Sequence, residues 1–151
     1  METIQDFEDM LDLLGKHGVR YLIIGGLAFI FHAKPRYTKD MDIWIEPSAD
    51  NIRKANAALA EFGSPTLIAD NEPFQVLQIG IAPDRIDFLV NVGVLDFETA
   101  WPKRIVRRYG GIEANWIDLD GLLEIKRRIN SPKHQDDARI LQEIKKLREK
   151  E

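Results

Sequence analysis

Residues 24–45, IGGLAFIFHAKPRYTKDMDIWI, carry the strongest structural signal in this chain. A β-rich run over 19–24 ends at its glycine pair, and the apolar residues over 27–33 predict a short helix that Pro35 closes. Over 41–45 apolar and polar residues alternate, which is typical of a strand with one apolar face. The order is therefore strand, glycine turn, helix, strand.

The flanking sequence adds helices and strands to this unit. Apolar residues recur at helical spacing over 4–17, and again from the candidate N-cap Ser48 to Gly63. The remaining pattern predicts strands at 74–81 and 85–90 joined as a hairpin at Pro83-Asp84, a second hairpin at 104–109 and 112–117, and helices at about 119–129 and 134–149. We expect an α+β fold in one domain, 1–151. Helices cover one face of its mixed sheet, and the other face is at least partly open. The C-terminal helices, about 119–149, pack on the domain.

The composition excludes several classes of function. The chain has 151 residues, of which 44% are hydrophobic, 30% are charged and none is Cys, so cysteine-based zinc sites and thiol chemistry are excluded. The three His are too few and too scattered for a histidine metal site. No apolar run approaches the roughly 20 residues of a membrane span, and no secretory signal is visible. We therefore expect a cytoplasmic protein.

Charge is distributed unevenly along the chain. The net charge of −4 combines −8 over residues 1–100 with +4 over 101–151. A globally acidic protein is a poor non-specific binder of nucleic acid, because that affinity comes from many phosphate contacts. The second half holds the candidates for a local basic surface, although such clusters are more often simply solvated helix and strand faces: Lys103, Arg104, Arg107, Arg108, Lys126, Arg127, Arg128 and Lys133.

Three carboxylates are the candidate catalytic residues. Asp40 and Asp42 stand two apart at the start of a strand, so their side chains share one face. Asp87 lies on the polar face of the strand predicted at 85–90 and completes a triad if the two strands are neighbours. Adjacent carboxylates favour a bound cation, and oxygen ligands favour Mg²⁺, two ions of which can clamp an in-line phosphoryl displacement. Alternatively, the Asp-x-Asp pair caps a turn, and Asp87 forms only a surface ion pair with Arg85.

The glycine pair suits the same chemistry. Without Cβ atoms, Gly25 and Gly26 let the backbone approach a triphosphate, and the following helix offers unpaired N–H groups. Arg36 could add a charge-assisted contact. Each of these residues, and Thr38, is also compatible with an ordinary turn or loop. The ordered combination with the three Asp residues is what favours a site.

The sequence resembles the nucleotidyltransferases with the DNA-polymerase-β-like fold, and among them the bacterial abortive-infection and toxin–antitoxin type. The resemblance rests on IGGLA at 24–28, on Arg36-x-Thr38-x-Asp40-x-Asp42, on RIDFL at 85–89, and on LLEIK at 122–126 followed by Lys133-x-x-Asp136-Asp137. It covers about residues 19 to 142. Many family members carry Gly-Ser at the turn, where this chain has Gly26, as the toxin-like branch does.

The resemblance implies roles for individual residues. Asp40, Asp42 and Asp87 would hold two Mg²⁺ ions, and Asp87 would help to deprotonate the acceptor hydroxyl. Gly25 and Gly26 would cradle the triphosphate, with Arg36 and Thr38 beside them. Lys126 and Lys133 are either phosphate or acceptor contacts or plain surface charges, because the C-terminal motif is altered here.

These residues predict a Mg²⁺-dependent nucleotidyltransferase that moves a nucleoside monophosphate from an NTP to a hydroxyl. The acceptor is an RNA 3′ end, a protein or a small molecule, and the basic second half mildly favours RNA of a tRNA-like kind. A cognate toxin or antitoxin protein is a possible partner. The alternatives are a degenerate binding or regulatory module and a plain structural domain. His32 is expected to be packed, and Trp44 either stacks on a base or packs in the core.

Overall fold

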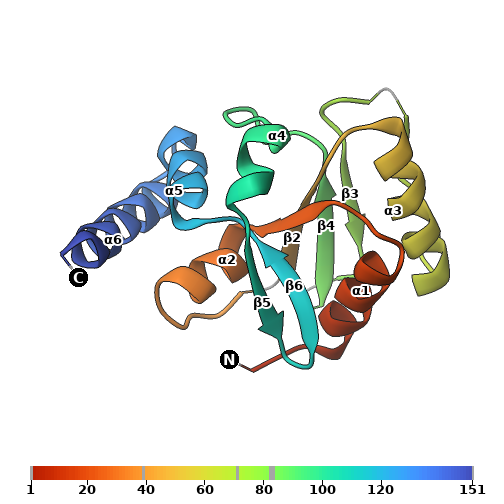
Figure 1. Ribbon diagram of the computed structural model, residues 1–151, viewed down its shortest axis with the longest axis horizontal. Helices are drawn as coiled ribbons and strands as arrows, with labels where there is room; N and C mark the ends of the chain where they lie inside the picture. The colour runs from red at the N-terminus through yellow and green to blue at the C-terminus, as the bar shows by residue number, and fades with distance from the viewer. Residues whose placement is uncertain (1, 39, 71, 82–83, 151) are drawn as a thin grey trace.

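The computed structural model describes residues 2–38, 40–70, 72–81 and 84–150. Figure 1 shows a mixed sheet with helices around it. The elements in chain order are α1 (Gln5–Lys16), β1 (Tyr21–Ile24), α2 (Gly25–His32), β2 (Asp40–Ile45), α3 (Ala49–Phe62), β3 (Val76–Ile79), β4 (Arg85–Leu89), α4 (Phe97–Ala100), the 3-10 turn η1 (Trp101–Lys103), β5 (Ile105–Tyr109), β6 (Ile112–Trp116), α5 (Leu119–Arg128) and α6 (Pro132–Glu149).

The six strands form one sheet in the order β3-β4-β2-β1-β6-β5. Strand β1 runs antiparallel to β2 and parallel to β6, whereas β2 runs parallel to β4. The two hairpins predicted from sequence, β3–β4 and β5–β6, are both antiparallel pairs and form the two edges. The parallel β2–β4 pair places two segments that are distant in sequence side by side.

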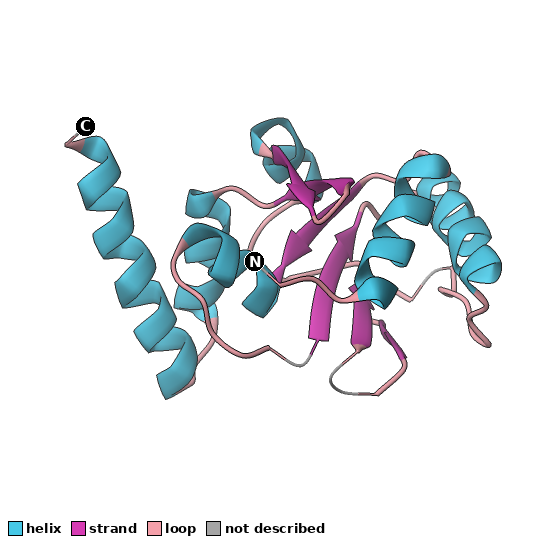
Figure 2. Ribbon diagram, turned by 90° about the horizontal axis from the view of Figure 1, so that it is seen from below, coloured by secondary structure: helices cyan, strands magenta, loops and turns pink. Residues whose placement is uncertain are grey.

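One face of the sheet carries the main core. Residues paired across neighbouring strands point to the same side, so Ile43 and its partner Phe88 share this face, and both are buried. Helices α1 and α3 contact each other and lie on this side of the sheet (Figures 1 and 2). Phe7 of α1 packs against Tyr109, with ring centroids 6.3 Å apart.

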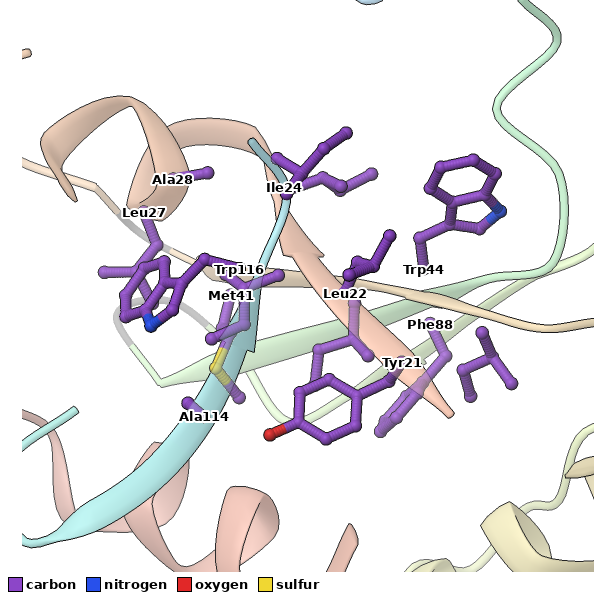
Figure 3. Packing of buried hydrophobic residues seen from close by; sticks show 14 of the residues in the cluster. Tyr21, Leu22, Ile24, Leu27, Ala28, Met41, Trp44, Phe88, Ala114 and Trp116 are labelled. Atoms are coloured by element: carbon purple, nitrogen blue, oxygen red, sulfur yellow. The ribbon is translucent and has the colours of Figure 1, made fainter. Parts of the chain in front are cut away.

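The opposite face is covered at one end only. Figure 3 shows Trp44 and Phe88 on opposite sides of the sheet. Trp44 is 1% exposed and meets Phe97 of α4 edge to face at 5.2 Å. Helix α5 also lies on this side, with α6 packed outside it (Figure 2). The Trp44 ring is therefore part of the core, and the alternative that it stacks on a base is wrong.

Local sequence explains where the helices begin and end. The Ser48 hydroxyl accepts a hydrogen bond from the Asn51 N–H at the start of α3, and Gly63 ends that helix with a φ of 96°. Asp118 and Ser131 cap α5 and α6 in the same way. Within the described residues, no helix is both long enough and apolar enough to cross a membrane.

The α+β prediction with a mixed sheet is confirmed, but helices lie on both faces of the sheet rather than on one, because α4 and α5 lie opposite α1 and α3. The remaining differences are local. Helix α2 begins at Gly25 rather than after the glycine pair, and α6 begins at Pro132, where proline suits a first helical turn. The short α4–η1 segment was not predicted, because four residues carry no periodic signal. Of the predicted hairpin turn, Pro83 lies outside the described residues.

Candidate active site

The register of the β2–β4 pair brings the acidic residues together. Asp42 lies directly opposite Asp87, and Asp40 lies opposite Arg85, all on the face that α1 and α3 do not cover. Asp40, Asp42 and Asp87 each offer a carboxylate oxygen, and these oxygens lie within 4.8 Å of one another. The parallel pairing of two strands more than forty residues apart thus assembles a three-carboxylate cluster.

The cluster faces a cleft between the sheet and the C-terminal helices. Its volume is about 300 Å³, and Asp42, Asp87 and Gly25 lie at the sheet side. Apolar residues of α5, among them Leu122 and Ile125, form the opposite wall together with Lys126. A polar floor beneath apolar walls is typical of a small-molecule site.

A larger hollow of about 830 Å³ lies elsewhere, beside α1 and α2. Aromatic and aliphatic side chains such as Phe7, Phe31 and Tyr109 line it, and none of the three clustered Asp residues does. The smaller cleft is the candidate active site because the ionisable groups converge there.

Mutual repulsion and burial disturb the ionisation of the cluster. Burial, followed by the charges of Asp40 and Asp87, raises the pKa of Asp42 to about 7. Burial also raises the pKa of Asp87, although Arg85 opposes this effect. A divalent cation would lower the pKa of both Asp42 and Asp87, since it would supply positive charge among these oxygens.

Arg85 is the residue of the site that the sequence reasoning underestimated. Its Nη2 lies 2.6 Å from Oδ2 of Asp40, and its Nε lies 3.1 Å from Oδ1 of Asp87. From the sequence alone, Arg85 is expected to form no more than a surface pair with Asp87. The position two residues before Asp87, on the same strand face, was the available signal, but its significance depends on the pairing of β4 with β2.

The glycine turn is shaped by its neighbours in the site. Gly25 has a φ of 69°, and a Cβ at this position would overlap the Asp42 carboxylate. A Cβ on Gly26 would lie 2.9 Å from Oγ1 of Thr38. The Thr38 hydroxyl itself donates to the Asp40 carbonyl at 3.2 Å. The glycines therefore make room for the carboxylate strand.

A second charged cluster lies at the other side of the cleft. Asp137 of α6 accepts two hydrogen bonds from Arg36, at 2.7 and 3.0 Å, and lies 3.0 Å from Nζ of Lys126. The Lys126 ammonium also lies 3.2 Å from Nδ1 of His134. Arg36 stacks over the Phe29 ring at 4.0 Å. This cluster joins the segment after α2 to α5 and α6.

Burial and pairing decide the ionisation of this second cluster. Burial lowers the pKa of Lys126, partly offset by Asp137. Burial opposes ionisation of Asp137 too, but the hydrogen bonds from Arg36 and Lys126 outweigh it and hold the pKa of Asp137 below its usual value. Lys126 is only 3% exposed, so the alternative that it is a plain surface charge is wrong.

The other predicted residues fall outside this arrangement. Lys133 is exposed at the start of α6, and among the residues that the structure describes it forms no ion pair with the three carboxylates. His32 is buried, as expected, and its Nε2 lies 2.7 Å from the Ile117 carbonyl oxygen. The roles of Arg36, Thr38, Lys126 and Lys133 in nucleotide binding stay predictions.

Solved structures of known proteins share this architecture. The lincomycin-bound lincosamide antibiotic adenylyltransferase LnuA matches with a TM-score of 0.61 and 16% identity, covering 94% of this chain and 98% of that one. ANT(2")-Ia in complex with adenylyl-2"-tobramycin matches with a TM-score of 0.59 and 12% identity, covering 94% and 92%. The chain has a nucleotidyltransferase fold.

A third similar structure is an antigenic nucleotidyltransferase-like protein from Paracoccidioides brasiliensis. It has a TM-score of 0.54 and 15% identity, and the match covers 96% of this chain and 78% of that protein. No family model matches the sequence, and no curated protein matches it. The likeness to nucleotidyltransferases is thus one of fold, and the abortive-infection or toxin–antitoxin type stays a prediction.

The carboxylate cluster fits a divalent cation of the Mg²⁺ type. All its donors are hard oxygen atoms, which Mg²⁺ prefers, and they converge from two rigid strands. Burial and the two neighbouring carboxylates raise the pKa of Asp42 to about 7, and a bound cation would act in the opposite direction. Asp40, Asp42 and Asp87 are the residues that would hold such an ion.

Proposed function

We propose that this protein is a Mg²⁺-dependent nucleotidyltransferase that transfers a nucleoside monophosphate from an NTP to a hydroxyl group. The observation that carries the proposal is the pairing of Asp42 with Asp87 across β2 and β4, which gathers three carboxylates beside the glycine turn. The nucleotidyltransferase fold of the chain supports it. Two ions would, when bound, neutralise charge on the triphosphate and activate the acceptor oxygen.

The protein groups around the cleft would bind and orient the two substrates. The N-terminus of α2, which begins at Gly25, offers N–H groups to the triphosphate. Lys126 lines the same cleft, where Asp137 and His134 hold its ammonium, and it suits a phosphate oxygen. Asp87 would accept the proton of the acceptor hydroxyl.

For the acceptor, we favour a small molecule that carries hydroxyl groups. Two of the similar structures hold such molecules: LnuA is bound to lincomycin, and ANT(2")-Ia is in complex with adenylyl-2"-tobramycin. The apolar wall formed by Leu122, Ile125 and Ile129 suits a partly apolar acceptor or a nucleobase. RNA and protein acceptors, and a toxin or antitoxin partner, remain alternatives that the same experiment tests.

The test follows a radioactive label from the α-phosphate of each NTP. The protein is incubated with Mg²⁺ and, in separate reactions, with hydroxyl-bearing antibiotics, total RNA or cellular protein. We expect the label to appear on one acceptor class, with release of pyrophosphate. Asp87→Asn should lower the rate at least about a hundredfold, because the proton acceptor and a metal ligand are lost.

Asp50→Asn is the matched control. Asp50 is an exposed carboxylate on α3, paired with Arg53 on the far side of the sheet, and its loss should leave the rate unchanged. Labelled transfer that survives Asp87→Asn would contradict the assigned site. Binding of MgATP without transfer to any acceptor would favour the degenerate binding or regulatory module instead.

A further inference from the structure

The guanidinium of Arg85 lies among the carboxylates that would hold the metal. Nη2 lies 2.6 Å from Oδ2 of Asp40 and 3.2 Å from Oδ2 of Asp87, while Nε lies 3.1 Å from Oδ1 of Asp87. Arg85 thus engages two members of the triad at once. Asp42, the third member, accepts no hydrogen bond from Arg85 among the described residues.

The register of the sheet imposes this arrangement. Arg85 is the β4 partner of Asp40, and Asp87 is the partner of Asp42, so four charged side chains form one compact square on the same face. The formal charge of this square is −2 with Arg85 and −3 without it. One divalent cation would neutralise the first of these charges but not the second.

A guanidinium and a divalent cation would compete for the same carboxylate oxygens, because each is held by their negative charge. An ion bound to Asp40 and Asp87 at ordinary metal–oxygen distances of about 2.0–2.1 Å would lie close to the positive nitrogens of Arg85 and be repelled by them. The Arg85 side chain is 34% exposed, against 9% for Asp87. Its guanidinium therefore has a route toward solvent when an ion enters, whereas the carboxylate does not.

We propose that Arg85 competes with the divalent cation for Asp40 and Asp87, so that the protein binds the ion weakly until a nucleoside triphosphate is present. The triphosphate supplies the extra oxygen ligands and negative charge that offset the lost ion pairs. Released from Asp40, the guanidinium can itself contact phosphate oxygens. Arg85 is a positioning residue that couples metal binding to nucleotide binding. This inference rests on the proposed function.

The test measures binding of Mn²⁺, as a paramagnetic substitute for Mg²⁺, by electron paramagnetic resonance. Binding is measured without nucleotide and with an NTP analogue whose α–β bridge is a methylene group. We expect Arg85→Gln to tighten Mn²⁺ binding about tenfold without nucleotide, and to shrink the gain in affinity that the analogue produces in the original protein. Arg85→Lys should tighten Mn²⁺ binding less than Arg85→Gln does. An ammonium keeps the positive charge but cannot contact both carboxylates with the planar geometry of the guanidinium.

Arg20→Gln is the matched control. It removes one positive charge from an ion pair with Glu46, at the opposite ends of β1 and β2 from the triad, and should leave Mn²⁺ affinity unchanged. Thermal unfolding in EDTA gives a second measurement. Arg85→Gln should lower the melting temperature there and show a larger rise on addition of Mn²⁺ than the original protein.

The outcomes separate this inference from the proposed function. Unchanged or weaker Mn²⁺ binding in Arg85→Gln, while the original protein binds Mn²⁺ with the analogue, overturns the inference alone. Absence of Mn²⁺ binding in every protein, even with the analogue, overturns both. If Arg85→Gln does not fold, Arg85→Lys decides: affinity equal to or weaker than that of the original protein overturns the inference.

Discussion

Gly25 lacks a Cβ atom, and both its backbone conformation and the geometry of the site require this. The residue has a φ of 69°, and the space that a side chain would need is filled by the Asp42 carboxylate. The turn between β1 and α2 therefore packs directly against β2, the strand that carries Asp42. Backbone conformation and site geometry depend on the same glycine.

Gly25→Ala should lower the free energy of unfolding more than Gly63→Ala does. Gly63 also has a positive φ, 96°, but nothing lies within 4 Å of its Cβ position, so its substitution reports backbone strain alone, about 1–2 kcal/mol. Urea denaturation of both variants measures the difference. Equal losses would show that Asp42 moves aside without cost.

His32 should make the stability depend on pH. Burial lowers its pKa below the ordinary 6.5, while the charges of Arg148 and Asp118 act in opposite directions on it. The unfolded chain binds a proton at His32 more readily than the folded chain does. The stability that the neutral, buried His32 contributes is therefore fully present above about pH 6.5 and is lost as the pH falls below that value. Chemical denaturation between pH 5 and 8 should show a flatter profile for His32→Gln. Parallel profiles for the two proteins would contradict the buried, neutral His32.

At the scale of elements, the C-terminal helices are held by charge as well as by apolar packing. Asp137 on α6 joins Arg36, which follows α2, to Lys126 on α5. Three segments meet at one carboxylate that is only 3% exposed. The position of α5, and with it one wall of the cleft, depends on this contact.

Asp137→Ala should destabilise the protein by about 3–5 kcal/mol, because it leaves the buried Lys126 ammonium without its counter-charge. Asp136→Ala is the matched control. Asp136 is the neighbouring exposed carboxylate, paired with Arg139 on the helix surface, and its loss should change stability by less than about 0.5 kcal/mol. Denaturant unfolding of both variants gives the comparison. Similar small losses would mean that Lys126 finds water or another partner.

Over the whole molecule, the candidate site exists only when the sheet is complete. Asp42 and Asp87 come from β2 and β4, which pair in parallel only after the chain between them has crossed over as α3 and β3. Trp44 and Trp116 lie in the core on the two sides of the same sheet and are fully buried. Loss of the sheet should therefore expose the tryptophans and scatter the carboxylates together.

Mn²⁺ binding and tryptophan fluorescence should accordingly be lost over the same range of urea concentration. The physical reason is cooperative unfolding of a single core, in which no strand pair survives alone. Water-proton relaxation reports bound Mn²⁺, and fluorescence reports the tryptophan environment. Mn²⁺ binding that persists after the fluorescence transition would place the ion on a local segment such as 40–42 rather than on the three-carboxylate cluster.

Much of this molecule could be predicted from sequence because its determinants are local. Alternation over 41–45, the glycines at 25 and 26, and the cap at Ser48 each act within a few residues, and the corresponding elements are present. The short α4 was missed because four residues carry no periodic signal, and its Phe97 is placed by contacts with Trp44 and Trp101. Apolar and polar alternation also could not reveal that Trp44 is covered on its own face.

The amino-acid order is enough to say which residues carry charge and on which side of a strand each one lies, since a strand alternates its faces. The pairing of β4 with β2, in the register that sets Asp87 beside Asp42 and Arg85 beside Asp40, follows only from the folded sheet. It also decided that Lys126 and Arg36 meet Asp137. Pairing partners and register depend on the burial of distant surfaces, which no local pattern specifies.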